Sequence, residues 1–272
     1  EDLLRRDFTV NALAIRVDED FGRLIDLCNG AEDLRRGLIR VLHDDSFQDD
    51  PTRVLRAVRL AESRSLRLSP RTHRLAVGAL RARALDTLSG TRLRDQLVLT
   101  LDHARVRDLA RRLDSLGFWR ALHPGLRLGA PAMRALSNLG RLRARLGEAP
   151  PCGWWALNLL ALAEHLSARE GLALAARLQL RAEERETILQ TLRLARPLGR
   201  RLSARTLAPG QVWRLLRRVP LAVPIFLAAR LPSGSTAKRR VMRFLLEDRW
   251  AKPLLGGADL LRLGVREGPE LG

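Results

Sequence analysis

The sequence predicts a mainly α-helical protein with a small β-hairpin near its N-terminus. From Asp44 onward, apolar residues recur at spacings of three and four between helix start and stop signals, which is the pattern of amphipathic helices. Before Asp44, two short apolar runs flank a turn that contains glycine. The chain has 272 residues, of which 46% are hydrophobic and 29% charged, so it can bury a substantial core.

The N-terminal segment contains the only convincing β pattern. Strands are predicted at Ala12–Val17 and Arg23–Asp26, because the loop between them has hairpin length and includes Gly22. A further short strand is predicted at Ile39–Leu42, after the charged segment Glu32–Arg36. The β structure is therefore expected at one end of the sequence.

Asp18 and Asp20 lie in the hairpin loop and form an Asp-x-Asp pattern, which can bind a divalent metal ion. Aspartate is also favoured in turns, because its short side chain hydrogen-bonds nearby backbone N–H groups. We therefore interpret both residues as turn residues. The five histidines show no metal-ligand spacing, so the sequence predicts no metal site in this chain.

The rest of the chain has the pattern of successive short helices. In the segment His103–Leu116, for example, the apolar residues form one stripe with arginines opposite. Trp154 and Trp155 lie on an apolar helix and are predicted core residues rather than a platform for bases. Breaks with proline or glycine are predicted at residues 123–125, 147–153, 197–199 and 231–234. The predicted helices are Pro51–Ser63, Pro70–Ala82, Gly90–Leu101, His103–Leu116, Met133–Leu146, Trp154–Ala168, Leu172–Leu178, Ala182–Leu194, Pro209–Arg217, Val223–Ala229, Thr236–Trp250 and Ala258–Leu263.

The charge balance indicates a polyanionic partner. There are 49 lysines and arginines against 30 acidic residues, which gives a net charge of +19. Codon bias in a GC-rich genome explains arginine in place of lysine, but it does not explain the excess of cations. The chain has six Phe, five Trp and no Tyr, which argues against an aromatic platform for single strands. Double-helical RNA, read through its shape and phosphates, fits this composition better.

The same composition argues for a reducing, aqueous compartment. The longest apolar runs, Gly153–Ala163 and Val219–Ala229, are too short to span a bilayer, so no membrane contact is predicted. No secretory signal is recognisable, and Cys28 and Cys152 lie far apart in the sequence. We therefore expect a cytoplasmic protein with no disulfide and no cysteine zinc site.

One helix start carries a candidate recognition site. Asp50 suits a helix N-cap and Pro51 the first helical position, because proline lacks only an N–H that would be unpaired there. Asp50 and Arg53 then share one helix face, and Arg56 and Arg59 continue at the same spacing. The bland interpretation of this pattern is a capping aspartate that also forms a surface salt bridge with Arg53.

The functional interpretation rests on hydrogen-bond chemistry. A carboxylate only accepts and a guanidinium only donates, so the pair matches a base edge with an exocyclic amine beside a ring-nitrogen acceptor. Adenine and cytosine present that edge, whereas guanine and uracil present a carbonyl beside a ring N–H. The pair Asp50 and Arg53 would therefore admit A and C and refuse G and U, with about 1–3 kcal/mol of discrimination.

Further motifs occur in a fixed order around this pair. The block from Arg5 to Ala14, Arg-Arg-Asp-Phe-Thr-Val-Asn-Ala-Leu-Ala, contains adjacent arginines suited to phosphates and an Asp and Asn suited to ribose hydroxyls. The other motifs lie at residues 25–40, 49–59, 89–97 and 256–269. Together they resemble the class II tRNA nucleotidyltransferase and bacterial poly(A) polymerase family, which includes the CCA-adding, CC-adding and A-adding enzymes. The resemblance covers nearly the whole chain.

The resemblance implies a division into four parts. Residues 1–43 would be the end of a nucleotidyltransferase head with a β-sheet, and residues 44–101 a helical neck that recognises the base. Residues 102–200 would be a helical body and residues 201–272 a helical tail that binds tRNA. The chain begins at Glu1 rather than at Met. The family's metal-binding carboxylates would precede Glu1, so no catalytic or metal residue is expected in this chain, and the chain alone is expected to be inactive.

The resemblance also implies roles for individual residues. Arg5, Asp7 and Asn11 match the motif that holds the sugar and triphosphate of the nucleotide. Asp50 and Arg53 match the template that pairs with the incoming base. Arg56 and Arg59 lie where the family is expected to support the phosphates or the template. Two positions depart from the family pattern, since Asp49 and Thr91 stand where glutamate is usual.

The activity implied by the resemblance is addition of C, A or both to the tRNA 3′ end. The 3′-hydroxyl would attack the α-phosphate of CTP or ATP with the help of Mg²⁺ bound upstream, and pyrophosphate would leave. The expected partners are the tRNA acceptor end and nucleoside triphosphates, with no obligate protein partner. The alternatives are a poly(A) polymerase of the same family and a non-catalytic helical module that binds RNA.

Overall fold

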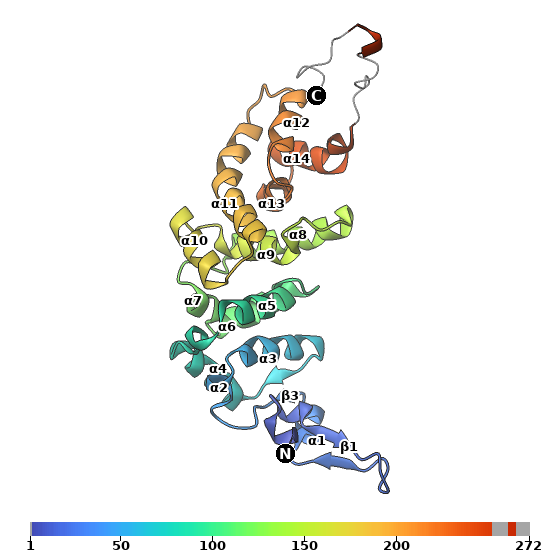
Figure 1. Cartoon of the computed structure of the whole chain (residues 1–272), viewed down its shortest axis with the longest axis vertical. Helices are drawn as coiled ribbons and strands as arrows, with labels where there is room; N and C mark the ends of the chain where they lie inside the picture. Colours follow the sequence, from blue (N-terminus) through green and yellow to red (C-terminus); the bar gives the residue numbers. More distant parts are fainter. Residues whose placement is uncertain (1, 252–260, 265–272) are drawn as a thin grey trace.

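The computed structural model describes residues 2–251 and 261–264 as an elongated stack of helices. The β-hairpin lies at one end of the stack, and helices α12 (Pro209–Arg217) and α14 (Thr236–Leu246) lie toward the other (Figure 1). The structure confirms the mainly α fold class. Half of the helix predicted at Ala258–Leu263 and most of the motif at residues 256–269 lie outside the described residues.

The elements follow one another with short connections. The N-terminal ones are η1 (Asp2–Arg5), η2 (Thr9–Asn11), β1 (Leu13–Ile15), β2 (Leu24–Asp26), α1 (Gly30–Arg35), β3 (Leu38–Ile39), α2 (Ser46–Asp49), α3 (Thr52–Ser63), β4 (Arg67–Leu68), α4 (Pro70–Arg81), η3 (Ala84–Thr87) and α5 (Gly90–Leu101). The later ones are α6 (Val106–Ser115), α7 (Phe118–Leu122), α8 (Ala130–Leu146), α9 (Gly153–Ala163), α10 (Ala168–Arg177), α11 (Ala182–Leu202), α12 (Pro209–Arg217), α13 (Ala222–Arg230), α14 (Thr236–Leu246) and η4 (Asp248–Trp250). Helices α5 and α12 have the predicted bounds.

The predicted hairpin is present with shorter strands. β1 and β2 pair antiparallel, with Ala14 opposite Ile25. In the turn between them, Arg16 donates to both carboxylate oxygens of Asp18, at 2.8 and 2.7 Å, and Arg23 donates to Asp20 at 2.9 Å. Both aspartates are therefore turn residues paired with arginines, as interpreted from the sequence.

The strand predicted at Ile39–Leu42 is displaced toward the N-terminus. β3 covers Leu38–Ile39 and pairs in parallel with β4, Arg67–Leu68, in a second small sheet. Val41 forms only an isolated bridge, with Phe8. The partner strand β4 was not predicted at all, because two residues are too few to show an alternating pattern.

The helix predicted at Trp154–Ala168 is too long at its C-terminal end, and the next helix starts earlier than predicted. α9 ends at Ala163, and α10 begins at Ala168, four residues before the start predicted at Leu172. The Ser167 hydroxyl accepts from the Glu170 backbone N–H, while the Glu170 carboxylate accepts from the Ser167 backbone N–H. This reciprocal capping box fixes the start of the second helix, and the prediction missed it.

The break predicted at Pro197–Gly199 is wrong, because α11 continues to Leu202. An interior proline costs a helix about 3 kcal/mol or more. Here, however, Leu198 and Leu202 are buried on the face that joins the core, and α11 packs against α13. Packing of this apolar face outweighs the cost of the proline. The predicted division between body and tail at residue 200 falls inside α11 and stays a prediction.

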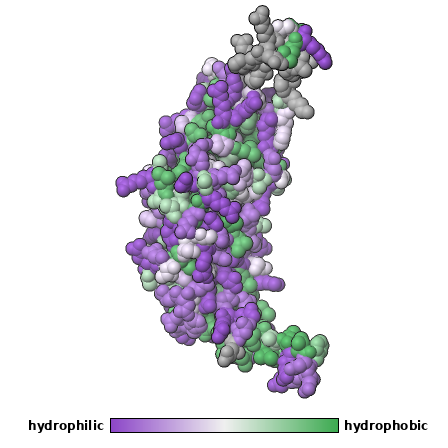
Figure 2. All heavy atoms as spheres, in the orientation of Figure 1, coloured by the Kyte–Doolittle hydropathy of each residue, from purple (hydrophilic) through white to green (hydrophobic). Residues whose placement is uncertain are grey.

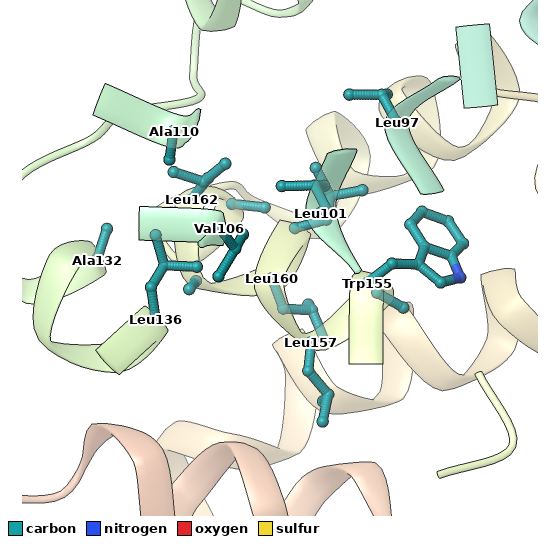
Figure 3. Close-up of a cluster of buried hydrophobic side chains, with 14 of the residues drawn as sticks. Leu97, Leu101, Val106, Ala110, Ala132, Leu136, Trp155, Leu157, Leu160 and Leu162 are labelled. Atoms are coloured by element: carbon teal, nitrogen blue, oxygen red, sulfur yellow. The ribbon is translucent and has the colours of Figure 1, made fainter. Parts of the chain in front are cut away.

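One continuous hydrophobic core runs through the stack. Every residue of α9 from Trp154 to Ala163 is buried, so this helix is surrounded by protein on all sides. Figure 3 shows Trp155 and Leu160 of α9 beside Leu101 of α5, with side chains of α6 and α8 nearby. Trp154 and Trp155 are each 5% exposed, which confirms that they are core residues.

The surface is largely hydrophilic, as Figure 2 shows for one face. Exposed apolar side chains gather on the hairpin end, where Val17 is 82% and Phe21 81% exposed. Within residues 2–251 and 261–264, no helix has the length and apolar character that crossing a membrane requires.

Candidate functional site

Asp7 organises a hydrogen-bonded cluster between the N-terminal turns and α3. It is 7% exposed, and its Oδ1 accepts from the Phe8 backbone N–H at 3.0 Å and from the Asn11 amide at 2.8 Å. Its Oδ2 accepts from Arg56 Nε at 2.7 Å and lies 2.6 Å from Arg56 Nη2. Asp7 therefore fixes the side chains of Asn11 and Arg56 relative to each other.

Four of the predicted site residues gather around one open pocket of about 410 Å³. Asp7 and Asn11 contribute from the N-terminal turns, and Arg56 and Arg59 from successive turns of α3. The remaining lining residues are Phe8, Leu60, Ser63, Leu99 and His103. The pocket therefore combines guanidinium and amide groups with an apolar wall, a composition suited to a phosphorylated, partly apolar ligand.

Arg59 is held more firmly than the other arginines of α3. Its Nη1 donates to Gln96 O at 3.1 Å and to Thr100 Oγ1 at 2.9 Å, and its Nη2 donates to Gln96 Oε1 at 2.6 Å. Burial, together with the positive charge of Arg56, lowers the pKa of the Arg59 guanidinium. Because its donors are largely used within the protein, Arg59 is suited to fixing α3 against α5.

Asp50 caps the start of α3 as predicted, with a shift of one residue. The helix begins at Thr52, with Pro51 as its N-cap residue, rather than at Pro51. Asp50 Oδ1 accepts from the Thr52 backbone N–H at 3.0 Å and from Thr52 Oγ1 at 2.6 Å. One carboxylate oxygen is thus committed to the cap, and the other points away from it.

The salt bridge between Asp50 and Arg53 that the bland interpretation requires does not form. Arg53 Nη1 instead donates to Ser46 Oγ at 2.6 Å, and Asp50 Oδ2 pairs with Arg92 Nη2 at 3.2 Å. Each of the two groups is therefore held by a third residue rather than by the other. Arg53 keeps free donors and Asp50 Oδ2 keeps a free lone pair, which is the arrangement that a shared external ligand requires.

Sequence reasoning missed two of these supports. Ser46 lies in the short helix α2, and Arg92 lies in the first turn of α5, far from Asp50 in the sequence. No spacing rule connects Arg92 to Asp50, although the motif at residues 89–97 contains it. Arg5 lies in η1, is exposed, and has no side-chain partner within the described residues. It is not among the residues that line the pocket.

The chain is similar to known proteins in both sequence and fold. The family of the poly A polymerase head domain matches residues 1–40. An A-adding tRNA nucleotidyltransferase of Geobacter sulfurreducens is 32% identical over 98% of this chain. The match covers 31% of that relative, so this chain spans about a third of its length.

Two solved structures have the same fold over nearly the whole chain. A CCA-adding enzyme in complex with ATP is 30% identical, with a TM-score of 0.84 over 99% of this chain and 64% of that one. The Thermotoga maritima CCA-adding enzyme in complex with tRNA is 28% identical, with a TM-score of 0.85 over 99% of this chain and 66% of that one. The likeness extends over both the N-terminal cluster and the helical stack.

Proposed function

Because the chain belongs to the class II tRNA nucleotidyltransferase and bacterial poly(A) polymerase family, we propose that the full-length protein matures tRNA 3′ ends. It adds C, A or both from CTP and ATP without a nucleic-acid template. The tRNA 3′-hydroxyl attacks the α-phosphate, a phosphodiester bond forms, and pyrophosphate leaves. This chain contributes base selection and part of the binding surface for nucleotide and tRNA.

The arrangement of Asp50 and Arg53 carries this proposal. Asp50 Oδ2 accepts the exocyclic amine of adenine or cytosine, and Arg53 donates to the adjacent ring nitrogen. The Thr52 contacts at 3.0 and 2.6 Å and the Ser46 contact at 2.6 Å hold the two groups before the base arrives. A guanine or uracil in the same place leaves Arg53 facing a ring N–H and Asp50 facing a carbonyl.

The pocket around Asp7 holds the rest of the nucleotide in this proposal. Asn11 is oriented by Asp7 through a bond of 2.8 Å, so its amide oxygen can accept from a ribose hydroxyl. Arg5 is exposed at the same end of the molecule and contributes charge toward the triphosphate. Arg56 is held by Asp7 and faces the sugar and phosphates from this pocket, while Arg59 fixes α3 against α5 through Gln96.

Mg²⁺ is the metal that the family implies. Residues 2–251 and 261–264 contain no cluster of three or more His, Cys, Asp or Glu side chains that could hold a metal ion. The Asp7 carboxylate is already occupied by four donors, from Phe8, Asn11 and Arg56. We therefore assign no Mg²⁺ ligand to the described residues.

Sequencing the products of the full-length protein on tRNA that lacks its 3′ CCA tests the proposed function. We expect the tRNA to gain C, A or CCA from CTP and ATP and to gain nothing from GTP or UTP. A long homopolymer of A would instead indicate the poly(A) polymerase activity. If no nucleotide is added in the presence of Mg²⁺ and tRNA is nevertheless bound, the protein is a non-catalytic RNA-binding module.

The proposed partner is tRNA in the cytoplasm, and its binding should depend steeply on salt. The chain has a net charge of +19, and several exposed arginines, among them Arg74, Arg134 and Arg145, have no side-chain partner within the described residues. If about six phosphates are neutralised, the logarithm of the association constant falls with log[salt] with a slope of about −4 to −5. Titrations of labelled tRNA between 50 and 200 mM salt, which is about the range where the effect is large, measure this slope. A slope near zero would contradict the electrostatic argument.

A further inference from the structure

The turn between α10 and α11 docks onto the first turn of α5. Gln179 Oε1 accepts from the Thr91 backbone N–H at 3.1 Å and from Thr91 Oγ1 at 2.6 Å. The Gln179 carbonyl oxygen accepts from Arg94 Nη1 at 2.9 Å. Gln179 itself has a left-handed backbone with φ 46°, and both its carbonyl and its side chain contact α5.

The two elements approach each other closely at Gly90. A Cβ atom at this position would lie 2.4 Å from the Arg177 carbonyl oxygen and 2.7 Å from Gln179 Cγ, so a larger residue does not fit there. Arg177 also donates to the backbone carbonyls of Leu88, at 3.3 Å, and of Leu85. The docking is therefore specific to this geometry and not a loose surface contact.

Gln179 completes the N-terminal cap of α5. The first backbone N–H groups of a helix have no partner within the helix. Ser89 Oγ accepts from the Arg92 N–H at 3.3 Å, and Gln179 accepts from the Thr91 N–H. Thr91 stands where the family usually has a glutamate, and its hydroxyl gives Gln179 a second donor. The orientation of the first turn of α5 thus depends on a residue from the α10–α11 turn.

Arg92 connects the first turn of α5 to Asp50, the aspartate proposed to select the base. Its side chain is 61% exposed, and its described contact is the ion pair of 3.2 Å with Asp50 Oδ2. Asp50 Oδ1 is committed to Thr52, so Arg92 determines where the free lone pair of Oδ2 points. A shift of the α5 first turn would move Arg92 and would change the direction in which Asp50 meets a base.

We propose that Gln179 is a positioning residue for base selection, which acts through Thr91, α5 and Arg92 on Asp50. The inference rests on the proposed function, because it assumes that Asp50 pairs with the incoming base. It assigns to the α10–α11 turn a role in choosing the nucleotide, although this turn touches neither Asp50 nor Arg53.

The test compares Gln179→Ala with Gln179→Glu in the full-length protein. The alanine variant removes the acceptor, so we expect the ratio of kcat/KM for ATP or CTP over GTP or UTP to fall about three- to tenfold. The glutamate variant keeps an acceptor oxygen and should stay within about twofold of the unmodified protein. Gln190→Ala is the matched control, because within the described residues the Gln190 side chain hydrogen-bonds only to Glu186 of its own helix, at 2.6 Å.

A double-mutant cycle with Arg92→Ala tests whether the effect of Gln179 on base selection passes through Arg92. If Gln179 acts through Arg92, the double variant should lose no more discrimination than Arg92→Ala alone. A fall in the melting temperature of Gln179→Ala with unchanged nucleotide preference would overturn the inference, since the contact would then be only structural. If Arg53→Ala relaxes base choice and Gln179→Ala does not, this inference fails and the proposed function stands. If the unmodified protein adds no nucleotide to tRNA, both fail.

Discussion

Arg53→Ala should reduce the preference for ATP and CTP over GTP and UTP about 5- to 150-fold, which corresponds to the 1–3 kcal/mol of a good bidentate base contact. The guanidinium is held by Ser46 Oγ at 2.6 Å and does not pair with Asp50, so its loss removes a donor to the base without disrupting an ion pair. Arg53→Lys should also lose discrimination, because a lysine ammonium lacks the planar fork. The measurement is kcat/KM for each of the four nucleotides with tRNA that lacks its 3′ CCA.

Arg64→Ala is the control for this prediction. Arg64 lies at the C-terminal end of the same helix, is exposed, and has no side-chain partner within the described residues. Its removal should leave the nucleotide preference unchanged, and the affinity of Arg53→Ala for tRNA should change by less than about twofold. An Arg53→Ala protein that selects nucleotides as the unmodified protein does would remove Arg53 from the template.

Local signals in the sequence predicted most of the helices. α4 and α5 begin at the predicted residues, Pro70 and Gly90, and the structure shows that Ser69 and Ser89 each accept from a backbone N–H three residues later. The hairpin and the cap at Asp50 were predicted for the same reason, since the residues that decide them are neighbours in the chain. Where the deciding interaction was tertiary, as for Pro197 inside α11, the local signal gave the wrong answer.

The sequence predicted which residues form the candidate site, but it did not predict the contacts that hold them. The sequence placed Asp50 and Arg53 on one helix face, and the salt bridge of the bland interpretation does not form between them. Arg92 and Gln179 approach the site from α5 and from the α10–α11 turn, so no short spacing relates them to Asp50. Such contacts depend on how helices pack, and a single sequence carries no periodic signal for them.

Asp7→Ala should weaken the binding of every nucleotide by about 10- to 100-fold without changing base preference. Hydrogen bonds to charged groups contribute about 1.5–3 kcal/mol, and Asp7 holds Arg56 at 2.7 Å as well as Asn11 at 2.8 Å. Its loss leaves Arg56 without its anion and frees the Asn11 amide. Because both groups face the sugar and phosphates in the proposed function, ATP and CTP should lose affinity equally. Equilibrium titration with each nucleotide measures this loss.

Asp7→Asn distinguishes the charge of Asp7 from its shape. The amide oxygen still accepts from the Phe8 N–H, but its NH₂ group faces Arg56, which only donates. Asp7→Asn should therefore be nearly as defective as Asp7→Ala, and combining either with Arg56→Ala should add little further loss. Asp108→Ala is the matched control, because the one ion pair of Asp108 in the described part of the chain is with Arg111 on the surface of α6, at 3.1 Å. A selective loss of one base in Asp7→Ala would contradict this division, since Asp7 would then belong with Asp50 and Arg53 in the template.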